Sequence, residues 1–236
     1  MRRLILELDG LPGLRDAMGA TDVDLPAAAT LAELAGVDGV RLGVNPDLKP
    51  VREEDVLDAR RAARRLELRM PPSETLIKVA LEARPDRVLL AADAREGILA
   101  AAPLDFQIPS PSLHPVVRAL QEAAIPVSAL VAPSVEAIKA VHGEGIEGVE
   151  LYTGTLVDLP PAERQGELQQ LGDAARLAPK LRMSLGVSGG LGYRTLREVL
   201  EVAAPANSVA VGRAALARAM LVGLDTALRD LRTLVT

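Results

Sequence analysis

Cysteine and tryptophan are both absent from the 236-residue sequence. Without cysteine, the chain has no disulfides, no thiolate nucleophile and no cysteine-ligated metal site. Aromatic residues make up only 1% of the chain, which argues against stacking platforms for nucleic-acid bases. A net charge of −5 argues against a surface that binds nucleic acid or anionic membranes.

Long hydrophobic runs are also lacking. The N-terminal apolar segment is too short for a secretion signal, and no run approaches the length that spans a bilayer. We therefore expect a cytoplasmic protein that contacts neither membranes nor nucleic acids. Aliphatic residues are abundant: hydrophobic residues make up 49% of the chain, enough for a large core.

Short apolar runs alternate with amphipathic stretches along the whole chain. This alternation predicts parallel strands joined by right-handed helical crossovers. Eight such units, and a first loop (9–15) without a dinucleotide fingerprint, favour an α/β fold with a single (β/α)8 TIM barrel as one domain over residues 1–236. The predicted strands are 3–8, 39–44, 66–70, 87–91, 126–131, 148–152, 182–187 and 208–212. The predicted helices are 25–34, 53–64, 73–83, 113–123, 135–141, 162–177, 194–202 and 213–234.

Two glycine-bearing turns, 186–192 and 209–213, follow the last two predicted strands. Glycine lets backbone N–H groups approach an anion closely, and the start of a helix adds a positive dipole end. Turns at these two places form the phosphate site of many TIM barrels. We therefore expect Gly190, Gly212 and Arg213, together with Asp9, to bind phosphate or a phosphorylated small molecule. The alternative is that the turns are only tight connections.

Several segments carry a resemblance to a known family. The run Leu8-Asp9-Gly10-Leu11-Pro12-Gly13-Leu14-Arg15 resembles the first-strand loop of the pyridoxine 5′-phosphate synthase family, TIM-barrel enzymes of the deoxyxylulose-dependent vitamin B6 pathway. That family condenses an aminoketone phosphate with deoxyxylulose phosphate, and its members are homo-oligomers. The resemblance therefore implies a phosphorylated substrate and a homo-oligomer. Further similar segments are 32–40, 70–83, 149–154, 190–193 and 212–228.

The sequence departs from the family at the residues that move protons. Gly43 stands at a catalytic histidine, Arg69 at the glutamate base and Gly189 at the histidine acid. The ring closure needs several proton transfers, which glycine cannot perform. The family residues that persist are Asp9, Glu150, Thr153, Gly154, Gly190 and Gly212. Other departures are Glu7, Gly10, Met18, Asn45, Pro50 and Arg213.

Charged residues fall on the predicted inner faces of the strands. Strand alternation places Arg41 with Gly43, and Glu67 with Arg69, on shared faces. One interpretation is a structural ion network, because buried charges are tolerated only when they are paired. The other is an anion pocket in which arginines hold carboxylate or phosphate groups. Either way, we expect the glutamates to meet the arginines at the barrel mouth: Glu7, Glu67 and Glu150 with Arg41, Arg69 and Arg213.

Histidine is scarce: only His114 and His142 occur, both in predicted helices or loops away from the carboxyl ends of the strands. No spacing of histidine and carboxylate residues suggests a metal site, and no cofactor is expected. A non-catalytic binding, regulatory or assembly protein, a pseudoenzyme with a residual phosphate site and possible protein partners, is thus the favoured function.

Two enzymatic functions stay open beside it. One is altered chemistry on a phosphorylated substrate, with Glu7, Asp9 or Glu150 as the base. In that case Arg69 or Arg213 would be an electrostatic clamp. The other is the family's synthase reaction, carried out by re-aligned residues.

Overall fold

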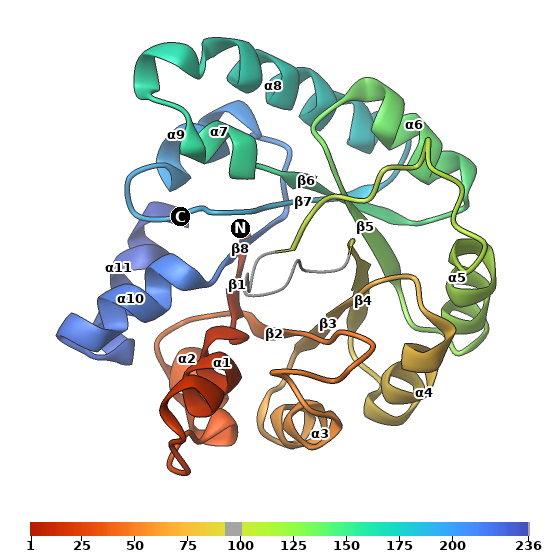
Figure 1. The fold of residues 1–236 in the computed structure, drawn as a ribbon. Coiled ribbons are helices and arrows are strands. Elements are labelled where there is room, and N and C mark those ends of the chain that lie inside the picture. The colour runs from red at the N-terminus through yellow and green to blue at the C-terminus, as the bar shows by residue number, and fades with distance from the viewer. Residues whose placement is uncertain (93–100, 236) are drawn as a thin grey trace.

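Eight parallel strands close into a barrel in sequence order, which confirms the predicted TIM barrel (Figure 1). The computed structural model describes residues 1–92 and 101–235. Each predicted strand is present, with ends that differ by one or two residues. The strands are β1 (Arg3–Glu7), β2 (Gly39–Gly43), β3 (Leu66–Met70), β4 (Arg87–Leu90), β5 (Val127–Val131), β6 (Gly148–Tyr152), β7 (Ser184–Ser188) and β8 (Ser208–Val211).

Helices form a ring outside the barrel and bury its outer face (Figure 1). Aliphatic residues pointing outward from the strands pack against the apolar faces of these helices, as parallel sheets require. The helices are α1 (Gly10–Met18), α2 (Leu25–Leu34), α3 (Glu53–Ala62), α4 (Glu74–Ala83), α5 (Leu113–Glu122), α6 (Val135–Gly143), α7 (Gly154–Asp158), α8 (Gln165–Lys180), α9 (Leu196–Val202), α10 (Arg213–Val222) and α11 (Leu224–Val235), with a 3-10 turn at Pro161–Glu163.

Three helices differ from the sequence prediction. The sequence pattern missed α1 and α7, because α1 contains Gly10, Pro12 and Gly13 and α7 has only five residues. The helix predicted over 213–234 is two helices, since the chain turns at Gly223 with a φ of 83°. This turn folds α11 back against α10, so the C-terminal region is a helical hairpin.

Residues 101–111, which contain three prolines and lead toward α5, form no regular helix or strand. Ala92 forms an antiparallel bridge with Ala102, and Leu104 forms a parallel bridge with Val131. These bridges bring the described end of the connection to the carboxyl end of the barrel, beside β5.

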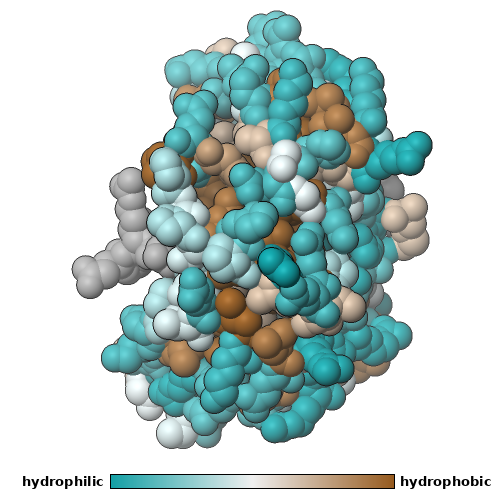
Figure 2. Space-filling model, turned by 90° about the vertical axis from the view of Figure 1, so that its right-hand side faces the viewer, coloured by the Kyte–Doolittle hydropathy of each residue, from teal (hydrophilic) through white to brown (hydrophobic). Residues whose placement is uncertain are grey.

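The outer surface over α4, α5 and α6 is mostly hydrophilic, with separate hydrophobic patches between the polar side chains (Figure 2). Scattered apolar residues of this kind are normal for a folded surface. In the described residues, no helix has both the length and the apolar character needed to cross a bilayer.

Candidate functional site

The barrel interior is unusually polar for a TIM barrel. Strand register and alternation give layers of four inward-facing side chains, each contributed by alternate strands. Such layers are ordinarily filled by bulky aliphatic residues, whereas here charged residues take part in all three. The layers, from the mouth downward, are Glu7, Arg69, Leu130 and Ser188; Arg41, Leu89, Glu150 and Ala210; Ile5, Glu67, Ser128 and Gly186.

Arg41 is the centre of this interior, with a relative exposure of 0%. Its two terminal nitrogens donate to the two carboxylate oxygens of Glu150, each at 2.7 Å. Its Nη2 also donates to Glu67 Oε2 at 2.8 Å, and its Nη1 to Glu7 Oε1 at 3.2 Å. The expected meeting of Arg41 with the three glutamates is thus present in the geometry.

Arg87 is a further member of the network that the sequence analysis missed. Its Nη2 donates to Glu67 Oε2 at 2.8 Å and to Glu150 Oε2 at 3.2 Å. The signal lay in the strand register, which places Arg87 directly beside Glu67 on the neighbouring strand. Sequence alternation alone gives the face of a strand but not which strands' residues stand opposite each other.

Arg69 forms the upper part of the network. Its Nη2 donates to Asp9 Oδ2 at 2.6 Å, and its Nη1 donates to Glu7 Oε1 at 3.1 Å. Asp9 also accepts the backbone N–H of Gly43 at 2.6 Å. A Cβ atom at Gly43 would lie 2.5 Å from Arg69 Nη2, so the guanidinium occupies the space of a side chain at position 43.

Charge pairing controls the pKa values of these carboxyls. Burial raises the pKa of Glu67 and Glu150, but the positive charges of Arg41 and Arg87 outweigh burial and hold both pKa values below the ordinary 4.5. At Asp9, burial outweighs the charge of Arg69, and the pKa is raised above its ordinary value. Asp9 therefore takes up a proton more readily than an ordinary aspartate does.

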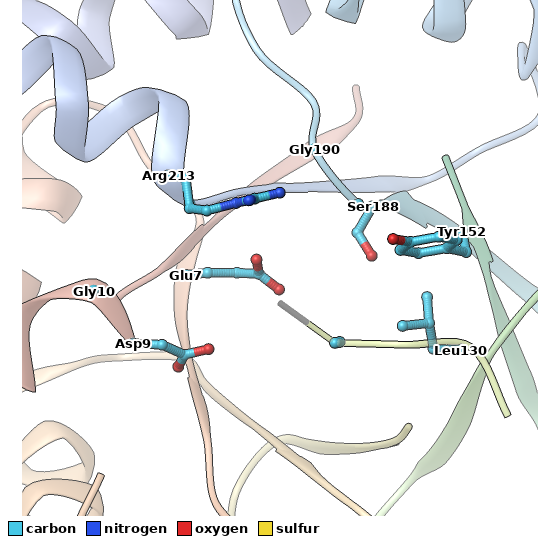
Figure 3. A pocket seen from close by; sticks show the side chains of 11 residues that line it. Glu7, Asp9, Gly10, Leu130, Tyr152, Ser188, Gly190 and Arg213 are labelled. Atoms are coloured by element: carbon cyan, nitrogen blue, oxygen red, sulfur yellow. The ribbon is translucent and has the colours of Figure 1, made fainter. Parts of the chain in front are cut away.

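A pocket opens above the network at the carboxyl ends of the strands (Figure 3). It has a volume of about 40 Å³ and adjoins a hollow of about 170 Å³ between the turns after β7 and β8. Glu7, Asp9 and Arg213 point into it (Figure 3). The lining residues are Glu7, Asp9, Gly10, Ala101, Leu130, Tyr152, Ser188, Gly189, Gly190, Gly212 and Arg213.

Arg213 does not join the glutamates as the sequence analysis expected. It forms no hydrogen bond or ion pair with any residue of the described ranges 1–92 and 101–235. Arg213 is the first residue of α10, and its exposed side chain extends along the pocket beside Glu7 (Figure 3). The expected network at the mouth is therefore corrected: Arg87 takes part in it and Arg213 does not.

The two glycine turns meet at this pocket. Gly189 and Gly190 have φ values of 107° and 69°, a conformation that favours glycine. A Cβ atom at Gly212 would lie 2.9 Å from the Cβ of Glu7, so the backbone passes close to β1. Thr153 holds the first turn in place by donating its hydroxyl to the carbonyl oxygens of Ser188 and Gly189, at 3.0 and 2.7 Å.

Neither histidine lies at the mouth. His114 is on α5 and His142 on α6, and both side chains are exposed on the helical ring. Among residues 1–92 and 101–235, no group of histidine and carboxylate side chains is arranged to hold a metal ion. The chemistry available at the pocket is thus that of Asp9, Glu7, Tyr152, Ser188 and Arg213.

Comparisons with known proteins converge on one family. Residues 4–236 match the family described as Pyridoxal phosphate biosynthesis protein PdxJ. The pyridoxine 5′-phosphate synthases of Geobacter metallireducens and of Synechococcus sp. strain CC9605 are each 31% identical over 100% of this chain. The matches cover 99% and 94% of those relatives, respectively.

Solved structures show the same fold at lower identity. A thiamine phosphate pyrophosphorylase from Pyrococcus furiosus is 15% identical with a TM-score of 0.60, and the match covers 99% of this chain and 95% of that one. A 3-keto-L-gulonate-6-phosphate decarboxylase from Vibrio cholerae is 17% identical with a TM-score of 0.64, over 99% and 97%. At such identities the likeness concerns the barrel alone.

We predict that Glu150→Gln destabilises the protein by about 3–5 kcal/mol, because it leaves Arg41 and Arg87 buried with too little negative charge. Urea unfolding followed by circular dichroism measures this loss. Glu201→Gln, at an exposed position on α9, is the matched control and should leave stability unchanged. Equal stability of the two variants would contradict a structural role for the network.

We also predict that acid weakens the fold through the same carboxyls. Glu67 and Glu150 have lowered pKa values when folded, so the unfolded chain binds more protons. Stability present above the ordinary pKa of 4.5 is then lost as pH falls below it. Asp9, with its raised pKa, opposes this trend. Unfolding free energies measured between about pH 3 and pH 6 should fall with acidification, and less steeply in Glu150→Gln than in Glu201→Gln. Identical slopes in the two variants would exclude Glu150 as the source.

Proposed function

From the premise that the chain belongs to the PdxJ family of pyridoxal phosphate biosynthesis proteins, we propose that it binds a phosphorylated small molecule at the mouth pocket without closing the pyridine ring. The observation that carries this proposal is the position of the Arg69 guanidinium. It fills the space that a side chain at position 43 needs, where the family resemblance expects a catalytic histidine.

Phosphate binding is supported by the free charge at the pocket. Arg213 has no carboxylate partner among the described residues, so its guanidinium is available to a ligand. The N-terminus of α10 and the turn of Gly189 and Gly190 border the same hollow. A helix start, a glycine turn and an arginine together form the arrangement by which barrels bind phosphate groups. Gly190, Gly212 and Arg213 are therefore the residues that we assign to the phosphate.

The loss of ring closure is supported at a second position. Gly189 has a φ of 107°, and a Cβ atom there would lie 2.6 Å from the ring of Tyr152. A histidine at this position would be strained and would displace the tyrosine. Since imidazole is the side chain suited to proton transfer near neutral pH, a mouth that rejects it at positions 43 and 189 is poorly suited to several successive proton transfers.

The size of the pocket also argues against closure of the pyridine ring. The described residues leave about 40 Å³ at the mouth and about 170 Å³ in the adjoining hollow. Small-molecule sites ordinarily measure about 300–1,000 Å³. Both spaces are below that range, so the pocket offers little room for the two substrates of a condensation. A binding or regulatory role, in a cytoplasmic homo-oligomer as the resemblance implies, fits such a site. Light scattering tests the oligomer, and a monomer would contradict it.

Enzymatic activity is the second candidate, and one observation favours it. Asp9 is buried, lines the pocket and has a raised pKa, which is typical of a carboxyl that transfers protons. The full-length match to relatives named pyridoxine 5′-phosphate synthase supports the same candidate. Under it, Asp9 is the base and Arg213 holds the phosphate, while Glu150 stays within the ion network.

We predict that a phosphorylated ligand stabilises the protein and that Arg213→Gln removes this effect, because the substitution deletes the free charge of the pocket. Thermal-shift assays with deoxyxylulose phosphate, pyridoxine 5′-phosphate and inorganic phosphate measure it; a ligand at about a hundred times its dissociation constant adds roughly 2.7 kcal/mol. Arg194→Gln, at an exposed position just before α9, is the control and should keep the full shift. Equal shifts in both variants would place the ligand elsewhere.

We further predict that the purified protein forms no pyridoxine 5′-phosphate from the aminoketone phosphate and deoxyxylulose phosphate above the rate without protein. Product analysis by liquid chromatography checks this, with a pyridoxine 5′-phosphate synthase relative as the positive control. Product formation that Asp9→Asn abolishes, with the thermal shift retained, would overturn the non-catalytic proposal in favour of the second candidate.

A further inference from the structure

The opposite, N-terminal end of the barrel carries a second cluster of charge that the proposed function does not use. Below the layer that contains Glu67, the register places a layer of two glycines, an arginine and a serine, and the rim of the barrel lies beneath it. We call the polar side chains of these two levels the floor. Its members are Arg3, Arg65, Arg87, Ser184 and Ser208.

Two atoms of the floor are buried without a hydrogen-bond partner in the described part of the chain: Nε of Arg87 and Oγ of Ser208. Arg87 is 4% exposed and Ser208 is 1% exposed. Leaving such a group without a partner is unfavourable, so a buried orphan atom indicates a missing partner. Here one donor belongs to a cation, and the other is a hydroxyl that is free to donate.

The two orphan atoms belong to residues that approach the same place. Arg87 Nη2 lies 3.2 Å from Glu150 Oε2. A Cβ atom built at Gly186 would lie 3.0 Å from that oxygen and 2.9 Å from Ser208 Oγ. Arg87 and Ser208, from β4 and β8 on opposite sides of the barrel, therefore both lie close to the Glu150 carboxylate.

The floor carries an excess of positive charge. Both oxygens of Glu67 are taken, one by Arg65 and the other by Arg41 and Arg87. Arg3 forms no side-chain hydrogen bond or ion pair with the described residues. The two acids whose charges act on it, Glu67 and Asp38, are paired with other arginines, Asp38 with Arg232 at 2.7 Å. Burial, and then the charges of Arg65 and Arg87, lower the pKa of Arg3. Arg3, Arg65 and Arg87 thus lie within reach of one another's charge, and Arg3 has no carboxylate partner among the described residues.

We propose that the floor binds one small inorganic anion of the halide type, such as chloride, between Arg3, Arg87 and Ser208. An anion there accepts from the orphan Nε and hydroxyl and offsets the surplus positive charge. Arg3 and Arg65 are partly exposed, so the ion enters from the N-terminal face. Side chains already occupy the space beside the two glycines of this level, which limits the size of the anion. The stem of Arg65 covers Gly39, and the hydroxyls of Ser128 and Ser184 crowd Gly148. Little space is left for an oxyanion.

Bromide is the direct probe, because it replaces chloride and scatters X-rays anomalously. A crystal of the full chain grown in sodium bromide should show an anomalous peak beside Arg87 Nε and Ser208 Oγ. A water molecule at that place, or no peak in the floor, overturns the proposal. This experiment does not involve the mouth pocket, so its outcome is independent of phosphate binding.

Solution measurements with two variants complete the test. Sodium bromide should raise the thermal midpoint saturably above that in sodium gluconate of equal ionic strength. Ser208→Ala and Arg3→Gln should each weaken apparent bromide affinity about tenfold or more, because each removes a donor to a charged partner. Both should fold, since neither side chain has a protein partner among the described residues. Arg197→Gln, exposed on α9, should match the unaltered protein. The same bromide affinity in all four proteins contradicts the site.

Discussion

The burial of Arg41 is the constraint on which the rest of the interior depends. A guanidinium with 0% exposure needs carboxylates on every side, because an unpaired charge in the protein interior costs several kcal/mol. Glu150, Glu67 and Glu7 supply them from three other strands. Gly186 then has to be small, since a Cβ atom there would lie 3.0 Å from Glu150 Oε2. Small inward residues of β5, β7 and β8, namely Ser128, Gly186, Ser208 and Ala210, are thus the counterpart of Glu150 and of the long charged residues of β1 to β4.

The same constraint shapes the mouth. Glu7 pairs with both Arg41 and Arg69, so the network extends upward to the bottom of the mouth pocket. Arg69 in turn pairs with Asp9, and its guanidinium fits because Gly43 has no side chain. Pairing among the protein's own charges therefore engages the carboxylates of Glu7 and Asp9 where they border the mouth pocket. Arg213 takes no part in this pairing, because it lies at the start of α10, on the other side of the pocket opening beside Glu7 (Figure 3).

The sequence predicts the barrel well, because eight apolar runs alternate with eight helical stretches and each strand is buried on its outer face. It predicts the network in part, because alternation gives the inward face of each strand but not the register between strands. Arg87 was missed for this reason, and Arg213 was wrongly included. Helix α1 was not predicted because its glycines and proline are typical of a loop. In the structure, Arg15 ties this largely exposed helix to Asp55 with hydrogen bonds of 2.7 and 3.1 Å.

The chain can belong to the PdxJ family and still have a charged barrel interior, because overall similarity and the chemistry of the interior depend on different residues. Identity of about 30% extends over the whole chain, far more residues than those that face the barrel mouth. The chemistry depends on a few inward positions, among them 43, 69 and 189, whose replacement hardly changes that percentage. The turns that border the Arg213 hollow keep their glycines, while the positions that would move protons hold glycine and arginine. The fold therefore follows from the family, whereas ligand binding and catalysis have to be judged from what each inward side chain touches.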